Sequence, residues 1–265
     1  FEHDPVSRAV ERRVVEAAPA IHKKAPLERG LLFSEMFGQD APKAVQVESL
    51  AGSLLRHSTQ SQRTADGSAR ITVPLPSART LKKAREFLPL VREHSRSWGV
   101  DPALVLAIMH TESAFNPLAC SHAPAYGLMQ IVPRSAGKDA TELFYGKPLV
   151  VTPSYLYGAN NNIRLGTAYL HLLETRSMRA IQDPESRMYC VIAAYNTGVG
   201  NVARSYTGSP DFASAAAQIN RRSPKSNYEY LVANLPHRET REYLPRVVSR
   251  LPVYRETPDD VLGVL

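Results

Sequence analysis

The stretch DPALVLAIMHTESAFNPLACSHAPAYGLMQIV (residues 101–132) decides the fold of this chain. It opens with an aspartate followed by a proline, the pair typical of a helix N-cap and a first helical position. Apolar residues then recur every three or four positions, and Glu112 falls on the same stripe. The pattern therefore predicts a helix that places one carboxylate among hydrocarbon side chains.

Glu112 has two interpretations at this point. A carboxylate at the rim of a core is often paired with an arginine or a lysine and then has only a structural role. A desolvated carboxyl group instead has a raised pKa and can keep its proton near neutral pH, which is what a general acid needs. The position of the residue alone leaves the two interpretations level.

The same periodicity makes the main part of the chain helical. Apolar residues follow helical spacing near residues 81–98, 159–175, 184–195 and 239–250. Prolines inside the first and last of these segments predict a kink or an interruption. Residues 138–158 are expected to form loops. The fold class is therefore predicted to be mainly α.

Residues 1–78 differ in character from the rest. Residues 1–30 are charged and can form at most one amphipathic helix, while residues 43–56 fit either a helix or a strand followed by a helix. Residues 57–70 are polar and typical of turns. The run ITVPLP (residues 71–76) is β-branched, but its proline limits it to an edge strand or a short extended segment. We predict a small mixed α/β domain that precedes the main domain.

The composition narrows the classes of partner. With 43% hydrophobic and 22% charged residues, the chain is typical of a globular protein. Its net charge of +7 suits an acidic partner, although the basic residues are dispersed along the sequence. The chain has a single tryptophan, so its sequence does not favour a surface on which the bases of a nucleic acid would stack. No apolar run approaches the roughly 20 residues of a membrane-spanning helix.

Several kinds of catalytic or metal site are not indicated. Cys120 and Cys190 are too few and too far apart for a zinc ribbon or a redox pair, and they fit buried thiols and a disulfide equally well. His110 and Glu112 are two positions apart on a helix and cannot bind one metal ion together. Ser113 lacks the glycine-flanked turn of a serine nucleophile. No phosphate or dinucleotide motif is found, so we expect no cofactor and no metal.

Two later segments offer groups that suit a hydroxyl-rich ligand. In AYGLMQIV (residues 125–132) a glycine permits close approach of the backbone, and the amide of Gln130 both donates and accepts hydrogen bonds. In AAYNTGVGN (residues 193–201) the ring of Tyr195 could stack on a sugar and Asn196 follows it. Each segment alone equally fits a turn into a helix or a helix C-cap.

Taken in order, ESAFNPLACS, AYGLMQI, AAYNTG and ETREYLPRV resemble the motif series of family 1 lytic transglycosylases, lysozyme-like enzymes that act on bacterial peptidoglycan. The resemblance covers roughly residues 85–252 and implies a goose-type, SLT-like catalytic domain over residues 79–265. The residues that lead into the first motif are similar to a membrane-bound subgroup. That subgroup carries a small extra domain ahead of the catalytic one, which would correspond to residues 1–78.

The resemblance implies that Glu112 is the single catalytic carboxylate. It would protonate the oxygen that links MurNAc to GlcNAc and then accept the proton of the MurNAc C6 hydroxyl, leaving a 1,6-anhydro end. Ordinary glycosidases need two carboxylates, whereas here the nucleophile belongs to the substrate. The residues implied to contact the substrate are Ser113, Met129, Gln130, Tyr195, Asn196 and Tyr243.

The resemblance also implies peptidoglycan glycan strands as the partner, a periplasmic location and a lipid anchor to the outer membrane. We expect a monomer that binds no nucleic acid. The nearest alternative is a goose-type lysozyme, in which an acid such as Asp139 or Glu142 positions a water. A non-catalytic peptidoglycan-binding protein would be expected to lack the glutamate, and a basic nucleic-acid binder rests only on net charge.

Overall fold

A computed structural model describes residues 61–63, 69–71 and 78–256 of the chain. The helix predicted within residues 1–30 and the elements predicted within residues 43–56 lie outside these ranges. The described residues belong to two compact units, and every candidate site residue lies in the unit that runs from Pro89 to Val248. The other unit contains the strands, the start of the first described helix and the end of the last one.

A short antiparallel pair of strands precedes the helices. Strand β1 (Ser61–Arg63) pairs with β2 (Ala69–Ile71), and Ser61 lies opposite Ile71. The turn-like composition of residues 57–70 does not locate these strands, because three-residue strands are too short to show an alternating pattern. The mixed domain predicted over residues 1–78 stays a prediction, since most of it lies outside the described residues.

From residue 78 onward the described chain is helical, which confirms the mainly α prediction. In chain order the helices are α4 (Ala78–Trp98), α5 (Pro102–Ser113), α6 (Ala136–Tyr145), α7 (Pro153–Leu156), α8 (Ala159–Leu172), the π-helical turn η1 (Leu173–Ser177), α9 (Pro184–Thr197), α10 (Val199–Thr207), α11 (Phe212–Ile219), α12 (Pro224–Asn234) and α13 (Arg238–Glu256).

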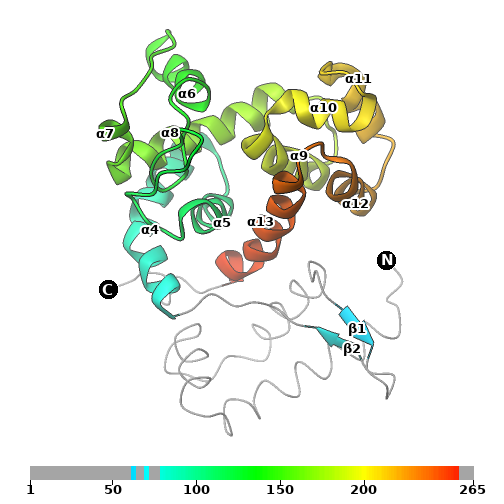
Figure 1. Ribbon diagram of the computed structural model, residues 1–265, viewed down its shortest axis with the longest axis horizontal. Helices are drawn as coiled ribbons and strands as arrows, with labels where there is room; N and C mark the ends of the chain where they lie inside the picture. The colour runs from blue at the N-terminus through cyan, green and yellow to red at the C-terminus, as the bar shows by residue number, and fades with distance from the viewer. Residues whose placement is uncertain (1–60, 64–68, 72–77, 257–265) are drawn as a thin grey trace, which may run out of the picture. The chain divides into compact units, whose positions relative to one another are not determined.

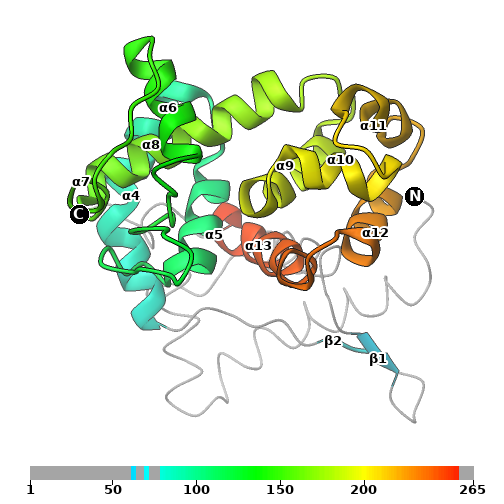
Figure 2. The same ribbon diagram turned by 45° about the horizontal axis from the view of Figure 1, so that its top comes forward.

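Helix α5 lies at the centre of the unit Pro89–Val248. Helices α6 and α7 pack against α8, while α10 and α12 pack against α9. Figures 1 and 2 both show α5 beside α13 and between these two groups. Every residue from Ala103 to Met109 is buried, so α5 is buried on all sides rather than along one stripe.

Aspartate–proline pairs begin two of the central helices, as the sequence predicts. The Oδ1 atom of Asp101 accepts a hydrogen bond from the backbone N–H of Ala103 at 2.9 Å, and proline follows at the first helical position. Asp183 caps α9 in the same way, accepting from the N–H of Ser186 at 2.6 Å. A side-chain acceptor in this position satisfies a backbone donor that the helix leaves unpaired.

Neither long helix is broken at its prolines, so the interruption predicted for the last helix is wrong and a restart at Pro89 does not occur. Helix α4 runs through Pro89, and α13 continues through Pro245 and Pro252. A proline removes one backbone hydrogen bond, but packing of an apolar face supplies most of the stability of a helix in a protein. Leu244 and Val247, on either side of Pro245, are fully buried and provide such packing.

The predicted loop over residues 138–158 is also wrong in large part. It contains most of α6 and all of α7, and only the short segment between them and the two residues after α7 are irregular. Thr141 holds the segment between α6 and α7 through Leu149. The Thr141 hydroxyl donates to the backbone carbonyl of Leu149 at 3.0 Å and accepts from the backbone N–H of Leu149 at 2.8 Å. Among the described helices, none has the length and apolar composition that crossing a membrane requires.

Asn162 of α8 fixes the segment that joins α5 to α6. Its side chain is fully buried, and Oδ1 accepts from the backbone N–H of Met129 at 2.8 Å. Its Nδ2 donates to the carbonyls of Tyr126 and Leu156, each at 2.8 Å. Gly127 is required beside it, because φ is +78° there and a Cβ would collide with the amide of Asn162.

We predict that Asn162→Ala destabilises the protein by about 3 kcal/mol, because three buried backbone groups lose their partners. Chemical denaturation measures this change in the free energy of unfolding. Asn161→Ala is the matched control, since Asn161 is half-buried and its Nδ2 makes one bond, to the carbonyl of Tyr155. Equal losses for the two variants would contradict the special role of Asn162.

Candidate active site

Glu112 lies in the last turn of α5 and meets α13 through one hydrogen bond. The hydroxyl of Tyr243, which is 131 residues further along the chain, donates to its Oε1 atom at 2.7 Å. Tyr243 is only 3% exposed, whereas Glu112 is half-buried and keeps contact with solvent. The structure therefore brings together the first and last motifs of the sequence around one carboxyl group.

Opposing effects act on the charge of Glu112. Together they raise its pKa to about 7: burial has the largest effect and raises the pKa, and the hydrogen bond from Tyr243 lowers it. The charge of Glu239 raises the pKa further, while that of Arg246 lowers it. A helix C-terminus also disfavours a negative charge, so the place of Glu112 in α5 acts in the same direction as burial. At neutral pH both the acid and the carboxylate forms are accessible.

Tyr195 of α9 lies close to the same carboxyl group. Its hydroxyl donates to the backbone carbonyl of Met129 at 2.8 Å, and its ring contacts that of Tyr169 at 5.6 Å between centroids. Burial and then the charge of Glu112 raise the pKa of Tyr195 well above its usual range. Tyr195 thus stays neutral and joins α9 to the segment that follows α5.

Ser113 and Met129 are engaged within the protein. The hydroxyl of Ser113 lies 2.8 Å from the carbonyl of Leu128, which attaches the end of α5 to the next motif. The side chain of Met129 is fully buried, and its sulfur occupies the space where Gly166 lacks a Cβ. The substrate contacts predicted for these two residues stay predictions, and any contact of Met129 would have to use its backbone.

Gln130 and Asn196 are half-buried and keep part of their amides available. Nε2 of Gln130 donates to the carbonyls of Ala119 and Gly127, while its Oε1 bonds to none of the described residues. The Oδ1 atom of Asn196 accepts from the hydroxyl of Thr240 at 2.7 Å, which joins α9 to the start of α13. Both residues can still offer a polar atom to a ligand.

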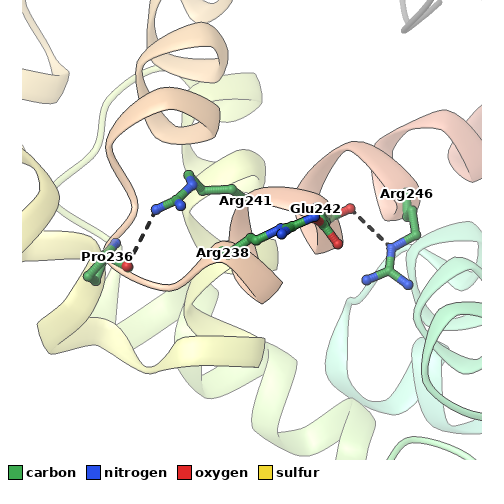
Figure 3. A network of polar contacts seen from close by, with 5 residues as sticks. All are labelled: Pro236, Arg238, Arg241, Glu242 and Arg246. Atoms are coloured by element: carbon green, nitrogen blue, oxygen red, sulfur yellow. Dashed lines mark hydrogen bonds and ion pairs between the residues drawn. The ribbon is translucent and has the colours of Figure 1, made fainter.

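Polar contacts brace the start of α13, which carries Tyr243. Arg238 forms an ion pair with Glu242 at 2.7 Å, and Nη1 of Arg241 donates to the carbonyl of Leu235 at 2.6 Å. Nε of Arg246 donates to the backbone carbonyl of Glu242 (Figure 3). Exposed ion pairs add little stability, so the carbonyl contact of Arg241 is the firmer support.

Three neighbours of the site were missed by sequence reasoning. Glu239 stands one helical turn before Tyr243 and could have been found from that spacing. Asn162 and Tyr169 carry no local signal, because their roles depend on contacts with segments far along the chain.

Cys120 and Cys190 are both free thiols, the first exposed and the second buried.

The acids considered for a lysozyme-type mechanism lie on α6. Burial and the charge of Glu142 raise the pKa of Asp139, and neither acid contributes to the pKa of Glu112. The acidic side chain whose charge does reach Glu112 is Glu239, which is exposed. Within the described ranges, no group of three or more acidic, histidine or cysteine side chains could hold a metal ion.

We predict that Tyr243→Phe and Glu239→Gln move the pKa of Glu112 in opposite directions. Loss of the Tyr243 hydrogen bond raises the pKa, and loss of the Glu239 charge lowers it. Carboxyl titration followed by NMR measures both shifts. High salt should shrink the effect of Glu239→Gln and leave that of Tyr243→Phe, because only the first is a charge interaction through solvent. Shifts of the same sign would refute this account.

Comparisons with known proteins find relatives of this chain. Residues 89–217 match the family model described as the Transglycosylase SLT domain. A protein of Salmonella arizonae named membrane-bound lytic murein transglycosylase C is 44% identical over 185 residues, which cover 70% of this chain and 51% of that protein. The protein of the same name from Actinobacillus succinogenes is 37% identical over 221 residues, covering 83% and 61%.

The chain thus spans between half and two thirds of the length of these curated relatives. The crystal structure of the 70 kDa soluble lytic transglycosylase of Escherichia coli aligns with a TM-score of 0.49 at 17% identity, covering 94% of this chain and 43% of that one. The family match includes α5, which carries Glu112, and α9, which carries Tyr195. Residues 89–217 of the chain thus match the transglycosylase SLT domain family.

Proposed function

We propose that this protein is a lytic transglycosylase that cleaves the β-1,4 bond between MurNAc and GlcNAc in peptidoglycan and leaves a 1,6-anhydroMurNAc end. The observation that carries the proposal is the desolvated carboxyl group of Glu112, held by the hydroxyl of Tyr243 at 2.7 Å. Its pKa of about 7 suits a group that first donates a proton and then takes one back. The named relatives support the same activity.

In the proposed reaction, protonated Glu112 gives its proton to the glycosidic oxygen of the GlcNAc leaving group as the bond to C1 of MurNAc breaks. The C6 hydroxyl of the same MurNAc then attacks C1. Its proton passes to the Glu112 carboxylate, which restores the acid form. No water is consumed, so the product is lighter by one water than the product of hydrolysis.

Tyr243 has a positioning role in this scheme. Because its hydroxyl occupies Oε1 of Glu112, Oε2 is the oxygen that carries the transferred proton. The hydrogen bond also stabilises the carboxylate that exists between the two proton transfers. We propose that Gln130, Tyr195 and Asn196 contact the glycan, and that Ser113 and Met129 support the site from behind.

We also propose peptidoglycan strands as the partner and the periplasm as the location. We further propose that the protein is a monomer and that a lipid anchor attaches it to the outer membrane. Support for attachment comes from relatives named membrane-bound, whose length exceeds that of this chain. Carboxylates on peptidoglycan stems suit the net charge of +7.

We predict that Glu112→Gln folds normally and loses about 10³-fold or more in activity, because the amide can neither donate nor accept the catalytic proton. Mass spectrometry of muropeptides released from purified peptidoglycan measures both rate and chemistry. Glu142→Gln on the exposed side of α6 is the matched control and should release anhydro products normally. Products with ordinary reducing ends would indicate a lysozyme and direct attention to Glu239 as the acid that positions water.

We predict that kcat/KM falls about tenfold per pH unit above pH 7, because Glu112 must start protonated and its pKa is raised to about 7. Below that pH the acid form dominates and this group no longer limits the rate. Initial rates of anhydro-muropeptide release across pH measure the profile. Glu239→Gln should move the falling limb to lower pH, and a profile that is flat through neutral pH would contradict the assignment of Glu112.

A further inference from the structure

Thr240 of α13 is a buried threonine whose hydroxyl bonds to another helix. It is 1% exposed, and its Oγ1 atom donates to Oδ1 of Asn196 on α9 at 2.7 Å. Thr111 and Thr207, in contrast, donate to carbonyls four residues earlier in their own helices, at 2.7 and 3.1 Å, which is common for a helical threonine. Thr240 instead uses its hydroxyl to join two helices.

The start of α13 explains why Thr240 has no such local bond. Thr240 lies in the first turn, so Pro236, four positions earlier, precedes the helix. The carbonyl of Pro236 accepts from Nη1 of Arg241 at 3.4 Å (Figure 3), and the same atom bonds to the carbonyl of Leu235 at 2.6 Å. A buried hydroxyl needs an acceptor, and among the described residues Thr240 finds it in Asn196.

The bond from Thr240 determines which way the carboxamide of Asn196 faces. Oδ1 is occupied by the hydroxyl of Thr240. Nδ2 bonds to no residue in the described part of the chain, and it is not among the buried polar atoms that lack a partner, so solvent reaches it. If the amide turned over, Nδ2 would face Thr240 and the buried hydroxyl proton would lose its acceptor, which is costly. The N–H groups of Asn196 are therefore the outward-facing ones.

The same face of α13 also contacts the candidate catalytic carboxyl group. Tyr243 lies three positions after Thr240, and residues with this spacing are neighbours on one face of a helix. Tyr243 is 3% exposed and donates to Oε1 of Glu112 at 2.7 Å. One face of α13 thus orients two side chains from other helices, Glu112 of α5 and Asn196 of α9.

We propose that Thr240 is a positioning residue for the reaction, which holds the carboxamide of Asn196 so that its N–H groups and not its oxygen meet the substrate. Asn196 then donates a hydrogen bond to an oxygen atom of the glycan. The inference rests on the proposed function, because it takes Asn196 as a residue that contacts the glycan. Thr240 itself is buried and acts only through Asn196.

Two substitutions of Thr240 separate the role of the hydroxyl from that of the side-chain shape. Thr240→Val keeps the shape and removes the donor, whereas Thr240→Ser keeps the donor. We expect Thr240→Val to lower kcat/KM for anhydro-muropeptide release from soluble glycan strands about 3- to 10-fold, the usual effect of one hydrogen bond. The loss should lie in KM, as expected for a contact made equally in ground and transition states. Thr240→Ser should recover most of the activity.

Thr207→Val is the matched control for the loss of a threonine hydroxyl. The hydroxyl of Thr207 bonds to the nearby carbonyls of Ala203 and Ser209, and it contacts no residue of the candidate site. Its removal should leave KM and kcat unchanged.

Two variants of Asn196 test whether Thr240 acts through it. Asn196→Asp keeps an acceptor for Thr240 but presents a second acceptor in place of the donor, so kcat/KM should fall about tenfold or more. In the Asn196→Ala background, adding Thr240→Val should cause no further loss, because a positioning residue has no effect without the side chain that it positions.

The pH profile shows whether α13 itself has moved. Thr240→Val should leave the falling limb of kcat/KM in place, because Tyr243 keeps its bond to Glu112. A shifted limb, an equal loss in Thr240→Ser, or losses that add to those of Asn196→Ala would make Thr240 merely structural and overturn the inference.

Full activity of Thr240→Val or of Asn196→Asp would also overturn the inference. All of these outcomes leave the proposed function standing, because the unmodified protein still releases anhydro-muropeptides. If the unmodified protein releases none, the proposed function itself fails, and the role of Thr240 with it.

Discussion

The placement of one carboxyl group at the end of a fully buried helix is the constraint on which this structure depends. Helix α5 is apolar on every side from Ala103 to Met109, so Glu112 emerges from the core where water is scarce. Burial and the nearby Glu239 favour the acid form, while Tyr243 and Arg246 favour the carboxylate. The result is a pKa of about 7, which no single one of these effects would produce.

Most of the motif residues act as braces for this carboxyl group. Ser113 contacts the carbonyl of Leu128, Tyr195 contacts the carbonyl of Met129, and Asn162 binds the N–H of Met129. Three helices thereby hold one short backbone segment beside Glu112. Gln130 within it has a positive φ of 47°, a strained conformation that persists only because the surroundings determine it. The conformation of this segment is thus set by contacts with the three helices around it.

The sequence predicts the parts of the fold that depend on neighbouring residues. The caps at Asp101 and Asp183 are local, and the structure agrees with them, whereas α5 is buried on all sides rather than along the predicted stripe. The continuation of α13 through Pro245 could not be predicted, because distant packing outweighs a local rule there. Asn162 looked like any polar residue of a helix, since its three partners lie 6 to 36 positions away in sequence.

The proposed use of one carboxylate for two proton transfers agrees with the opposing effects of its surroundings on the pKa of Glu112. Enzymes that divide acid and base work between two carboxyl groups need environments that push the two pKa values apart. A single group that does both must instead have a pKa near the working pH, so that neither transfer is strongly uphill. Tyr243 serves the second half of such a cycle, because its hydrogen bond to Oε1 is strongest when Glu112 carries a charge. Burial serves the first half of the cycle, because it favours the protonated form of Glu112. The exposed Glu239 also raises the pKa of Glu112.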